Sequence, residues 1–448
     1  MGNVTFIEMR PVVDCVRLKG ASAKLSMGLV IITLLTVGCS DSNRSDSTGP
    51  GGLPGEGAEL TDDRVLEPFF GVVFDRSGEG LATEAQIAQM QELGIGYAKF
   101  HAFWDQTEAE LAGYNLSLND FGVAGDDRPT DLTRELLAGN PQWIEEYAFP
   151  ERSDSRFSGL IDWSLMDGVV DQLLAAGIRP LPMITDSLFA PRITLPDGRY
   201  RILPEPLDFI QPGVAGIGRE AYLAHAELHT AAVARRYSGQ PRRVTWWNIE
   251  NELNLAYLHV QVFGWRTGDA WLNDAFLVDL LATLYRGLKL GSPDARATHN
   301  VNPIGPNWAD DLASYAEHLD AIGIGAYPNY VSPRPLQTEV LIAGVEAAAA
   351  FGKPVIVLET GNPSGPASGG WDEALQAEYL ATAPVESFNA GAIGYIHFLL
   401  NDRDPKIWDS NEGELTQVEN YWGLVRVDGT YKPSFEILQG ILQDITGE

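Results

Sequence analysis

The feature that most constrains the fold is an alternation, repeated eight times after residue 66, between short apolar runs and segments of helical periodicity. Runs rich in β-branched residues are typical of buried strands, and their alternation with helices is typical of a parallel sheet. We expect strands at 69–74, 97–101, 178–184, 244–249, 295–301, 319–325, 354–358 and 392–398. We expect helices at 83–94, 162–176, 220–237, 269–290, 308–318, 336–350, 371–388 (kinked at Pro384) and 434–445. Eight such units predict an α/β fold, a (β/α)8 TIM barrel, over residues 66–448.

Two of the connections, 105–159 and 185–219, are too long to be plain turns. Long loops in a compact domain are usually functional. Because both follow strands, both fall on the face of a barrel that carries active sites. We expect them to form walls of a cleft.

The first 38 residues have the layout of a secretory signal. Arg17, Lys19 and Lys24 precede the apolar run 25–38. That run is too short to span a membrane comfortably, which disfavours a transmembrane anchor. Cys39 follows the run, and Thr36-Val-Gly-Cys39 resembles a bacterial lipoprotein signal whose cysteine is lipidated.

Lipidation of Cys39 predicts a protein anchored by its N-terminus to the bacterial cell envelope. Ser40 resembles the residue found in lipoproteins sent to the outer membrane. Removal of residues 1–38 would remove Cys15 and leave one cysteine, so we expect no disulfide. Residues 39–65, rich in Ser, Gly, Asp and Pro, are expected to be a flexible tether.

Composition excludes one class of partner. The formal net charge is -30, whereas nucleic-acid binding needs a basic face. The hydrophobic fraction of 45% is that of an ordinary globular protein with a large core.

Carboxylates follow the fourth and the seventh predicted strands. The run 244–249 leads into Asn251 and Glu252, and 354–358 leads into Glu359. Either glutamate alone is as easily a solvated charge at a strand end. Strands four and seven, however, face each other across a barrel mouth, and retaining glycosidases hold two carboxyl groups roughly 5–5.5 Å apart. The pair predicts Glu359 as nucleophile and Glu252 as general acid/base.

Other side chains are expected around this pair. Tyr327 ends the sixth strand and is placed to hydrogen-bond Glu359 and keep it ionised and aimed, and Asn251 is placed to bind the sugar 2-hydroxyl. Five tryptophans lie in or beside loops after strands, where aromatic faces can stack on sugars: Trp104, Trp308, Trp371, Trp408 and Trp422. Each alone is as easily a core residue, but together they favour a carbohydrate cleft. We place Trp104 and Trp308 in the substrate site.

The histidines leave alternatives open. His225 and His229 are four apart, as in a zinc motif, but the glutamate between them is misplaced and the helix is an outer one. His299 and His397 either line the cleft or are ordinary strand histidines. We expect neither metal nor cofactor.

Five stretches carry a family resemblance: residues 97–104 (YAKFHAFW), 162–167 (DWSLMD) with 173–180 (LLAAGIRP), 247–255 (WNIENELNL), 326–328 (AYP), and 421–425 (YWGLV) with Lys432-Pro433. They resemble clan A retaining glycoside hydrolases, most closely family 39, the β-xylosidase and α-L-iduronidase group, over about residues 69–442. The resemblance implies that Glu252 is the acid/base and Glu359 the nucleophile. It puts His101, Asn251 and Tyr327 in the substrate site. It does not fix the sugar, because some members act on exopolysaccharides.

The chain departs from the family pattern at four positions. Lys99 stands where an arginine usually steadies the nucleophile, and Leu253 replaces the proline after the acid/base. Gly325 occupies a position often held by histidine, and Phe398 one commonly held by tryptophan. Lys99 and Phe398 are still expected to line the substrate site. These departures bear on sugar specificity and rate.

The sequence thus supports a lipid-anchored retaining glycosidase whose partners are a carbohydrate substrate and a membrane, not nucleic acid. An alternative is a glycan-binding surface lipoprotein on a barrel with impaired catalysis. A third is a metal-dependent hydrolase on the same fold.

Overall fold

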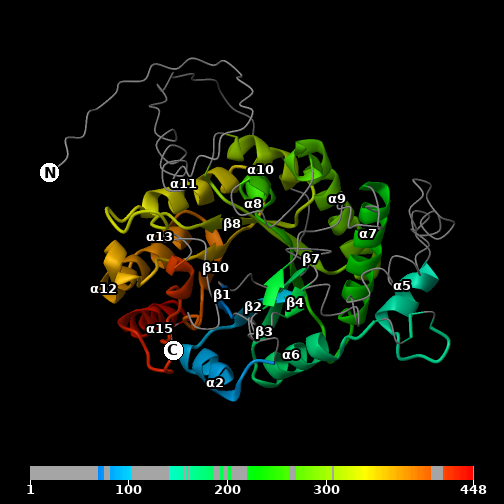
Figure 1. Ribbon diagram of the computed structural model, residues 1–448, viewed down its shortest axis with the longest axis horizontal. Coiled ribbons are helices and arrows are strands. Elements are labelled where there is room, and N and C mark those ends of the chain that lie inside the picture. The colour runs from blue at the N-terminus through cyan, green and yellow to red at the C-terminus, as the bar shows by residue number, and fades with distance from the viewer. Residues whose placement is uncertain are drawn as a thin grey trace, which may run out of the picture.

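A closed barrel of eight parallel strands forms the centre of the molecule, which confirms the predicted fold class (Figure 1). The computed structural model describes residues 69–74, 81–102, 141–155, 157–158, 161–184, 192–194, 200–202, 219–261, 269–304, 307–404 and 417–446. The barrel strands are β1 (Phe69–Val73), β2 (Tyr97–Ala102), β3 (Arg179–Ile184), β6 (Trp246–Asn251), β7 (Arg296–Val301), β8 (Ala321–Ala326), β9 (Val355–Thr360) and β10 (Ala392–Phe398). They are ordered β1-β10-β9-β8-β7-β6-β3-β2 around the ring. The fourth and seventh barrel strands of the sequence are therefore β6 and β9.

Helices surround the barrel in a ring (Figure 1). They are α2 (Glu84–Leu93), α6 (Ser164–Ala175), α7 (Arg219–Arg236), α9 (Asp274–Gly291), α10 (Trp308–Ala316), α11 (Thr338–Ala349), α12 (Glu373–Leu380), α13 (Ala383–Asn389) and α15 (Pro433–Thr446). The helix expected at 371–388 is two helices, because the chain breaks after α12 and Pro384 lies in the first turn of α13, where its missing N–H is tolerated. Most other predicted boundaries differ from the structure by only a few residues.

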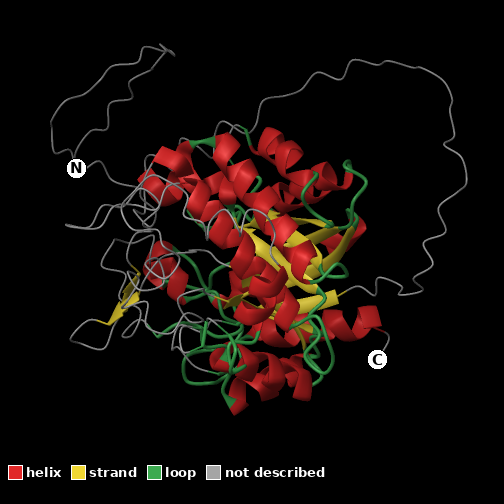
Figure 2. Ribbon diagram, turned by 90° about the vertical axis from the view of Figure 1, so that its right-hand side faces the viewer, coloured by secondary structure: helices red, strands yellow, loops and turns green. Residues whose placement is uncertain are grey.

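Further elements lie in and beside the long connections. Helix α5 (Pro141–Ala148) falls within 105–159, and the antiparallel hairpin β4 (Arg192–Thr194) with β5 (Tyr200–Ile202) falls within 185–219. The hairpin stands apart from the barrel strands (Figure 2). A 3-10 turn η3 (Leu253–Leu255) and helix α8 (Ala256–Gln261) follow β6 directly, and a 3-10 turn η4 (Asp269–Leu272) precedes α9. The predicted N-terminal signal, the predicted tether and Cys39 lie outside the described residues, among which no helix is long and apolar enough to cross a membrane.

Local sequence sets the ends of the helices. Thr83 and Gln86 form a capping box at the start of α2, and Gly94 ends that helix in the left-handed conformation. Helices α7 and α9 pack closely because glycines face α7, and a Cβ at Gly291 would lie only 2.0 Å from the Ala231 carbonyl oxygen. The residues that cap α2 can be recognised in the sequence. The need for glycine at position 291 becomes clear only when α7 is seen packed against α9.

Aromatic rings fill the amino end of the barrel. The Phe69 ring centroid lies 4.4 Å from that of Tyr97 and 6.2 Å from that of Trp246, all at strand starts. The guanidinium groups of Arg179 and Arg296 lie over the Tyr97 and Trp246 rings, at 4.3 and 5.4 Å. This end is a packed core, as in other barrels of this type, so chemistry falls to the other end.

The carboxyl end of the barrel is irregular where β6, β8 and β9 finish. Strand register shifts occur between Asn248 and Asn251 on β6 and near Gly325 on β8. Glu250 and Glu252 have φ of 62° and 45°, which is unusual for residues other than glycine. Each such conformation costs roughly 1–3 kcal/mol and is typical of functional sites. The bulges re-aim side chains at this mouth.

Candidate active site

Glu359 lies near the end of β9 and is 4% exposed. Its Oε1 receives a bond of 2.6 Å from the Lys99 ammonium on β2, and its Oε2 receives one of 2.7 Å from the Tyr327 hydroxyl just after β8. Lys99 is itself fully buried. The carboxylate is therefore oriented by a donor on each oxygen, one of them charged. Lys99, which stands at the arginine position of the resembling family, contacts Glu359 directly.

Glu252 follows the last residue of β6. Its Oε1 receives a hydrogen bond of 2.8 Å from the side-chain amide of Asn302, just after β7. Below it, His299 Nδ1 lies 3.0 Å from the carbonyl oxygens of Ile249 and Glu250, so the ring supports the irregular end of β6.

Two observations show that Glu252 and Glu359 lie near the same residues. Gly325 is the register partner of Glu359, and a Cβ at Gly325 would lie 3.1 Å from Glu252 Oε1. Burial raises the pKa of Tyr327 well above its usual range, and the charges of Glu359 and then Glu252 raise it further. Tyr327 thus lies in the field of both carboxylates.

Crowding by neighbouring side chains accounts for the glycine at position 325. A Cβ there would also lie 3.1 Å from Asn300 Nδ2, so any side chain would crowd both the amide and Glu252. The histidine often found at this position in the resembling family does not fit this arrangement without movement.

Aromatic side chains form a wall beside Glu359. Trp422 packs against Tyr327 with a centroid distance of 5.1 Å, against Phe398 at 6.0 Å, and parallel to Tyr330 at 5.9 Å. Trp422 is fully buried and Phe398 is 9% exposed. Trp422 therefore supports the wall from behind.

A third carboxylate, Glu419, lies at this wall. Burial raises the pKa of Glu419, the Arg403 guanidinium and a hydrogen bond with Tyr330 oppose the rise, and the charge of Glu359 adds to it. Arg403 forms an ion pair with Glu419 at 3.3 Å and lies 5.7 Å from the Phe398 ring centroid. Nothing in the sequence marked Arg403 or Glu419, because neither ends a strand.

The remaining predicted site residues are placed as follows. Asn251 ends β6, and its side-chain oxygen is buried with no hydrogen-bond partner among the described residues. His101 is partly exposed on β2. Trp308 begins α10 and packs against the core between barrel and helices. Trp104 lies outside the described residues.

The other tryptophans and histidines are mostly buried. Trp371 donates from its ring N–H to the Asn329 carbonyl at 3.0 Å, and Trp408 lies outside the described residues. His299 and His397 are both fully buried, which favours their reading as ordinary strand histidines. Burial lowers the pKa of His397 to about 3, so this ring is neutral at working pH.

His229 is buried in the outer core, stacked on Trp163. Within the described part of the chain, no three His, Cys, Asp or Glu side chains are grouped to hold a metal ion.

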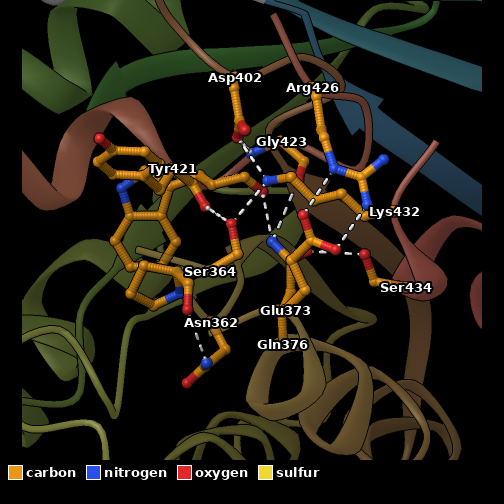
Figure 3. A network of polar contacts seen from close by, with 12 residues as sticks. Asn362, Ser364, Glu373, Gln376, Asp402, Tyr421, Gly423, Arg426, Lys432 and Ser434 are labelled. Carbon is orange, nitrogen blue, oxygen red and sulfur yellow. Dashed lines mark hydrogen bonds and ion pairs between the residues drawn. The ribbon is translucent and has the colours of Figure 1, made fainter. Parts of the chain in front are cut away.

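A buried polar network holds the aromatic wall in place (Figure 3). The Lys432 ammonium donates to Ser364 Oγ at 2.7 Å, Asp402 Oδ1 at 2.6 Å and the Gly423 carbonyl at 2.7 Å. Asp402 also accepts from the Gly423 N–H at 2.9 Å. One lysine thus joins the segments after β9 and β10 to Gly423, the residue after Trp422, which packs on Tyr327.

This network predicts a pH dependence of stability. Burial raises the pKa of Asp402 from 3.8 to about 6, although Lys432 and the Gly423 N–H act against the rise. The folded protein therefore takes up a proton in this window that the unfolded chain takes up only at lower pH. The contribution of Asp402 protonation to stability is complete at pH values below the pKa of Asp402 in the unfolded chain. It is lost as pH rises through about 6, the pKa of Asp402 in the folded protein. We expect wild type to gain stability relative to Asp402→Asn as pH falls through this window, measured by urea unfolding. A difference that is constant with pH would contradict this assignment.

Comparisons with known proteins identify the fold of this chain. No family model and no curated protein matches the chain. A hyperthermophilic β-glucosidase mutant covers 83% of this chain and 98% of its own length at 15% identity, with a TM-score of 0.54. GH5_18 from Streptomyces cattleya, in complex with GlcNAc, covers 85% and 81% at 15% identity, with a TM-score of 0.52. A family 39 glycoside hydrolase from Bacteroides cellulosilyticus WH2 covers 84% and 63% at 16% identity, with a TM-score of 0.48.

These neighbours are glycoside hydrolases, and at such identities the likeness shows the barrel fold. The chain spans 63% of the family 39 protein and 60% of an exo-β-1,4-mannosidase from Opitutaceae bacterium strain TAV5. An activity is therefore inferred from the residues of the site and not from the fold.

Proposed function

We propose that the chain is a retaining glycoside hydrolase in which Glu359 is the nucleophile and Glu252 the general acid/base. The observation that carries the proposal is the convergence of these carboxylates, from β6 and β9, on Gly325 and Tyr327. A retaining mechanism requires two carboxyl groups with different roles on either side of one glycosidic bond.

The different surroundings of the two glutamates support the division of roles. Glu359 is held by the Lys99 ammonium and the Tyr327 hydroxyl, which suits a group that attacks as an anion from a fixed position. Glu252 Oε1 is held by the neutral amide of Asn302, which suits a group that alternates between acid and base.

The reaction follows from these roles in two steps. Glu359 forms a bond to the anomeric carbon while the bond to the leaving oxygen breaks and Glu252 gives that oxygen its proton. Water then adds to the anomeric carbon, giving its proton to Glu252, and the bond to Glu359 breaks. The sugar configuration is kept, and both carboxyl groups return to their starting state.

The setting of this activity follows from the sequence. We propose anchoring to the bacterial cell envelope through lipidated Cys39, with a poly- or oligosaccharide as substrate. Family 39 membership stays a prediction, as does the place of Trp104, Trp308 and His101 in the substrate site.

The second candidate is a glycan-binding lipoprotein with impaired catalysis. The residues at Lys99, Gly325 and Phe398, which depart from the resembling family, motivate it. The direct Lys99–Glu359 bond and the fit of Gly325 beside Glu252 favour the active enzyme, because both departures preserve the arrangement of the carboxylates.

A hydrolysis screen separates the two candidates. Purified wild type is incubated with a glycan panel and a set of fluorogenic monosaccharides, and released reducing sugar or fluorophore is measured. We expect turnover of at least one substrate. Sugar binding without any hydrolysis would support the second candidate.

A further inference from the structure

Asn302 stands out among the residues around Glu252, because it contacts that carboxylate directly and is not among the site residues expected from the sequence. It is 3% exposed and lies one residue beyond β7. Its Nδ2 donates to Glu252 Oε1 at 2.8 Å. The opposite orientation of the amide would set its oxygen against a carboxylate oxygen, which is repulsive.

The backbone of Asn302 is fixed independently of this bond. Its N–H donates to Asn254 Oδ1 at 3.1 Å, and its carbonyl accepts from Asn254 Nδ2 at 2.8 Å. Asn254 lies in η3, directly after Glu252 and Leu253. The reciprocal pair joins the end of β7 to the turn that carries the acid/base, so the amide is presented from a rigid position.

Glu252 needs such a contact. A glutamate has three rotatable side-chain bonds, and the backbone of Glu252 has an unusual φ of 45° at the end of a strand. Gly325 leaves the room in which Oε1 lies, and Asn302 supplies the bond that holds it there.

We propose that Asn302 is the positioning residue for the acid/base, and this inference rests on the proposed function. By holding Oε1, Asn302 makes Oε2 the atom that carries the proton. An amide N–H bonds to Oε1 both in the carboxylate and in the carboxylic acid. It therefore holds Glu252 in both steps, whereas a cation would oppose the protonated state.

Loss of the bond between Asn302 and Glu252 should affect substrates differently, according to their leaving group. Oε2 gives its proton to the leaving oxygen as the glycosidic bond breaks and takes one from water in the second step. A leaving group that departs unaided, such as 2,4-dinitrophenolate, needs no proton in the first step. Misplacing Oε2 should therefore slow cleavage of poor leaving groups much more than that of activated ones.

The test uses Asn302→Ala, which removes the amide and leaves both backbone bonds to Asn254 in place. For a sugar that wild type cleaves, we expect kcat/KM to fall roughly 10–100-fold for an alkyl or natural glycoside and less than about threefold for the 2,4-dinitrophenyl glycoside. Asn302→Asp puts a second carboxylate beside Glu252, so the basic limb of the kcat/KM profile should move to higher pH.

The matched control is Asn273→Ala. Asn273 Oδ1 accepts from the Phe276 N–H at 3.0 Å and caps α9, so its loss lowers stability without touching Glu252. We expect no dependence on leaving group for this variant.

Equal losses for both leaving groups in Asn302→Ala, or no loss, would overturn the role of Asn302 while the proposed function stands. Absence of any turnover by wild type would remove the proposed function and this inference together.

Discussion

Glu359→Gln should lower kcat by at least about 10⁴-fold on any glycoside that the wild type cleaves, because no other group at the site is placed to form the covalent intermediate in this account. Glutamine is preferred to alanine because Lys99 is buried against Glu359, and an unpaired buried ammonium destabilises the fold by roughly 3–5 kcal/mol. The amide oxygen keeps an acceptor for Lys99, and the amide N–H can donate to the Tyr327 hydroxyl oxygen in place of the bond that Tyr327 donates in the wild type. Steady-state kinetics measured beside thermal unfolding would separate lost chemistry from lost structure.

Glu346→Gln is the matched control for this variant. Glu346 is exposed on α11, away from the barrel mouth, and its substitution should leave kcat within about twofold. Substantial activity in Glu359→Gln would rule out the nucleophile assignment.

Glu252→Ala should lower kcat/KM roughly 10²–10⁴-fold for glycosides with poor leaving groups and far less for 2,4-dinitrophenyl glycosides. The reason is that the first step then lacks its proton donor, while Glu359 can still displace a good leaving group. The second step becomes slow because water has no base, so the glycosyl-enzyme accumulates. Leaving-group dependence of kcat/KM measures this effect.

Azide supplies the complementary evidence for Glu252. It is a good nucleophile that needs no base, and the shortened side chain leaves room for it. Added azide should restore turnover of the dinitrophenyl glycoside and yield a glycosyl azide of retained configuration. An equal loss for all leaving groups, with no azide product, would assign another role to Glu252.

The barrel and the carboxylate pair were predictable from the sequence because each depends on local pattern. Buried parallel strands produce apolar runs, and a strand that ends at a barrel mouth exposes its last polar side chains there. Glu252 and Glu359 follow such runs directly, and Tyr327 could be placed against Glu359 once strand order was assumed. The break in 371–388 was placed near Pro384 but expected as a kink, because residue periodicity continues across it.

The contacts around the carboxylates were not predictable, because they join residues far apart in sequence. Asn302 donates to Glu252, which lies 50 positions earlier in the chain, and no sequence pattern indicates the register shift between Asn248 and Asn251 that precedes Glu252. Glu419 and Arg403 come together beside Phe398 only after the chain has passed β10. Of the five tryptophans, Trp371 and Trp422 are buried, and Trp422 packs against Tyr327 and Phe398.

Two of the residues that depart from the resembling family, Lys99 and Gly325, lie beside the carboxylates in the structure. Lys99 still bonds to Glu359, although as a single-point donor in place of a bidentate one. Gly325 and Asn302 form a local arrangement around Glu252 that differs from one with a histidine at position 325. Lys99 and Gly325 thus lie beside Glu359 and Glu252 where the resembling family usually has other residues.

The most direct measurement of the central claim is the identity of the residue that carries the sugar in the covalent intermediate. A 2-deoxy-2-fluoro glycosyl fluoride of the cleaved sugar slows both steps and lets the intermediate accumulate, and peptide mass spectrometry then locates the label. Assignment of Glu359 as the nucleophile predicts one fluoroglycosyl group per chain, attached to Glu359, and its loss in Glu359→Gln. Attachment to another residue, or hydrolysis with inverted configuration and no adduct, would contradict it.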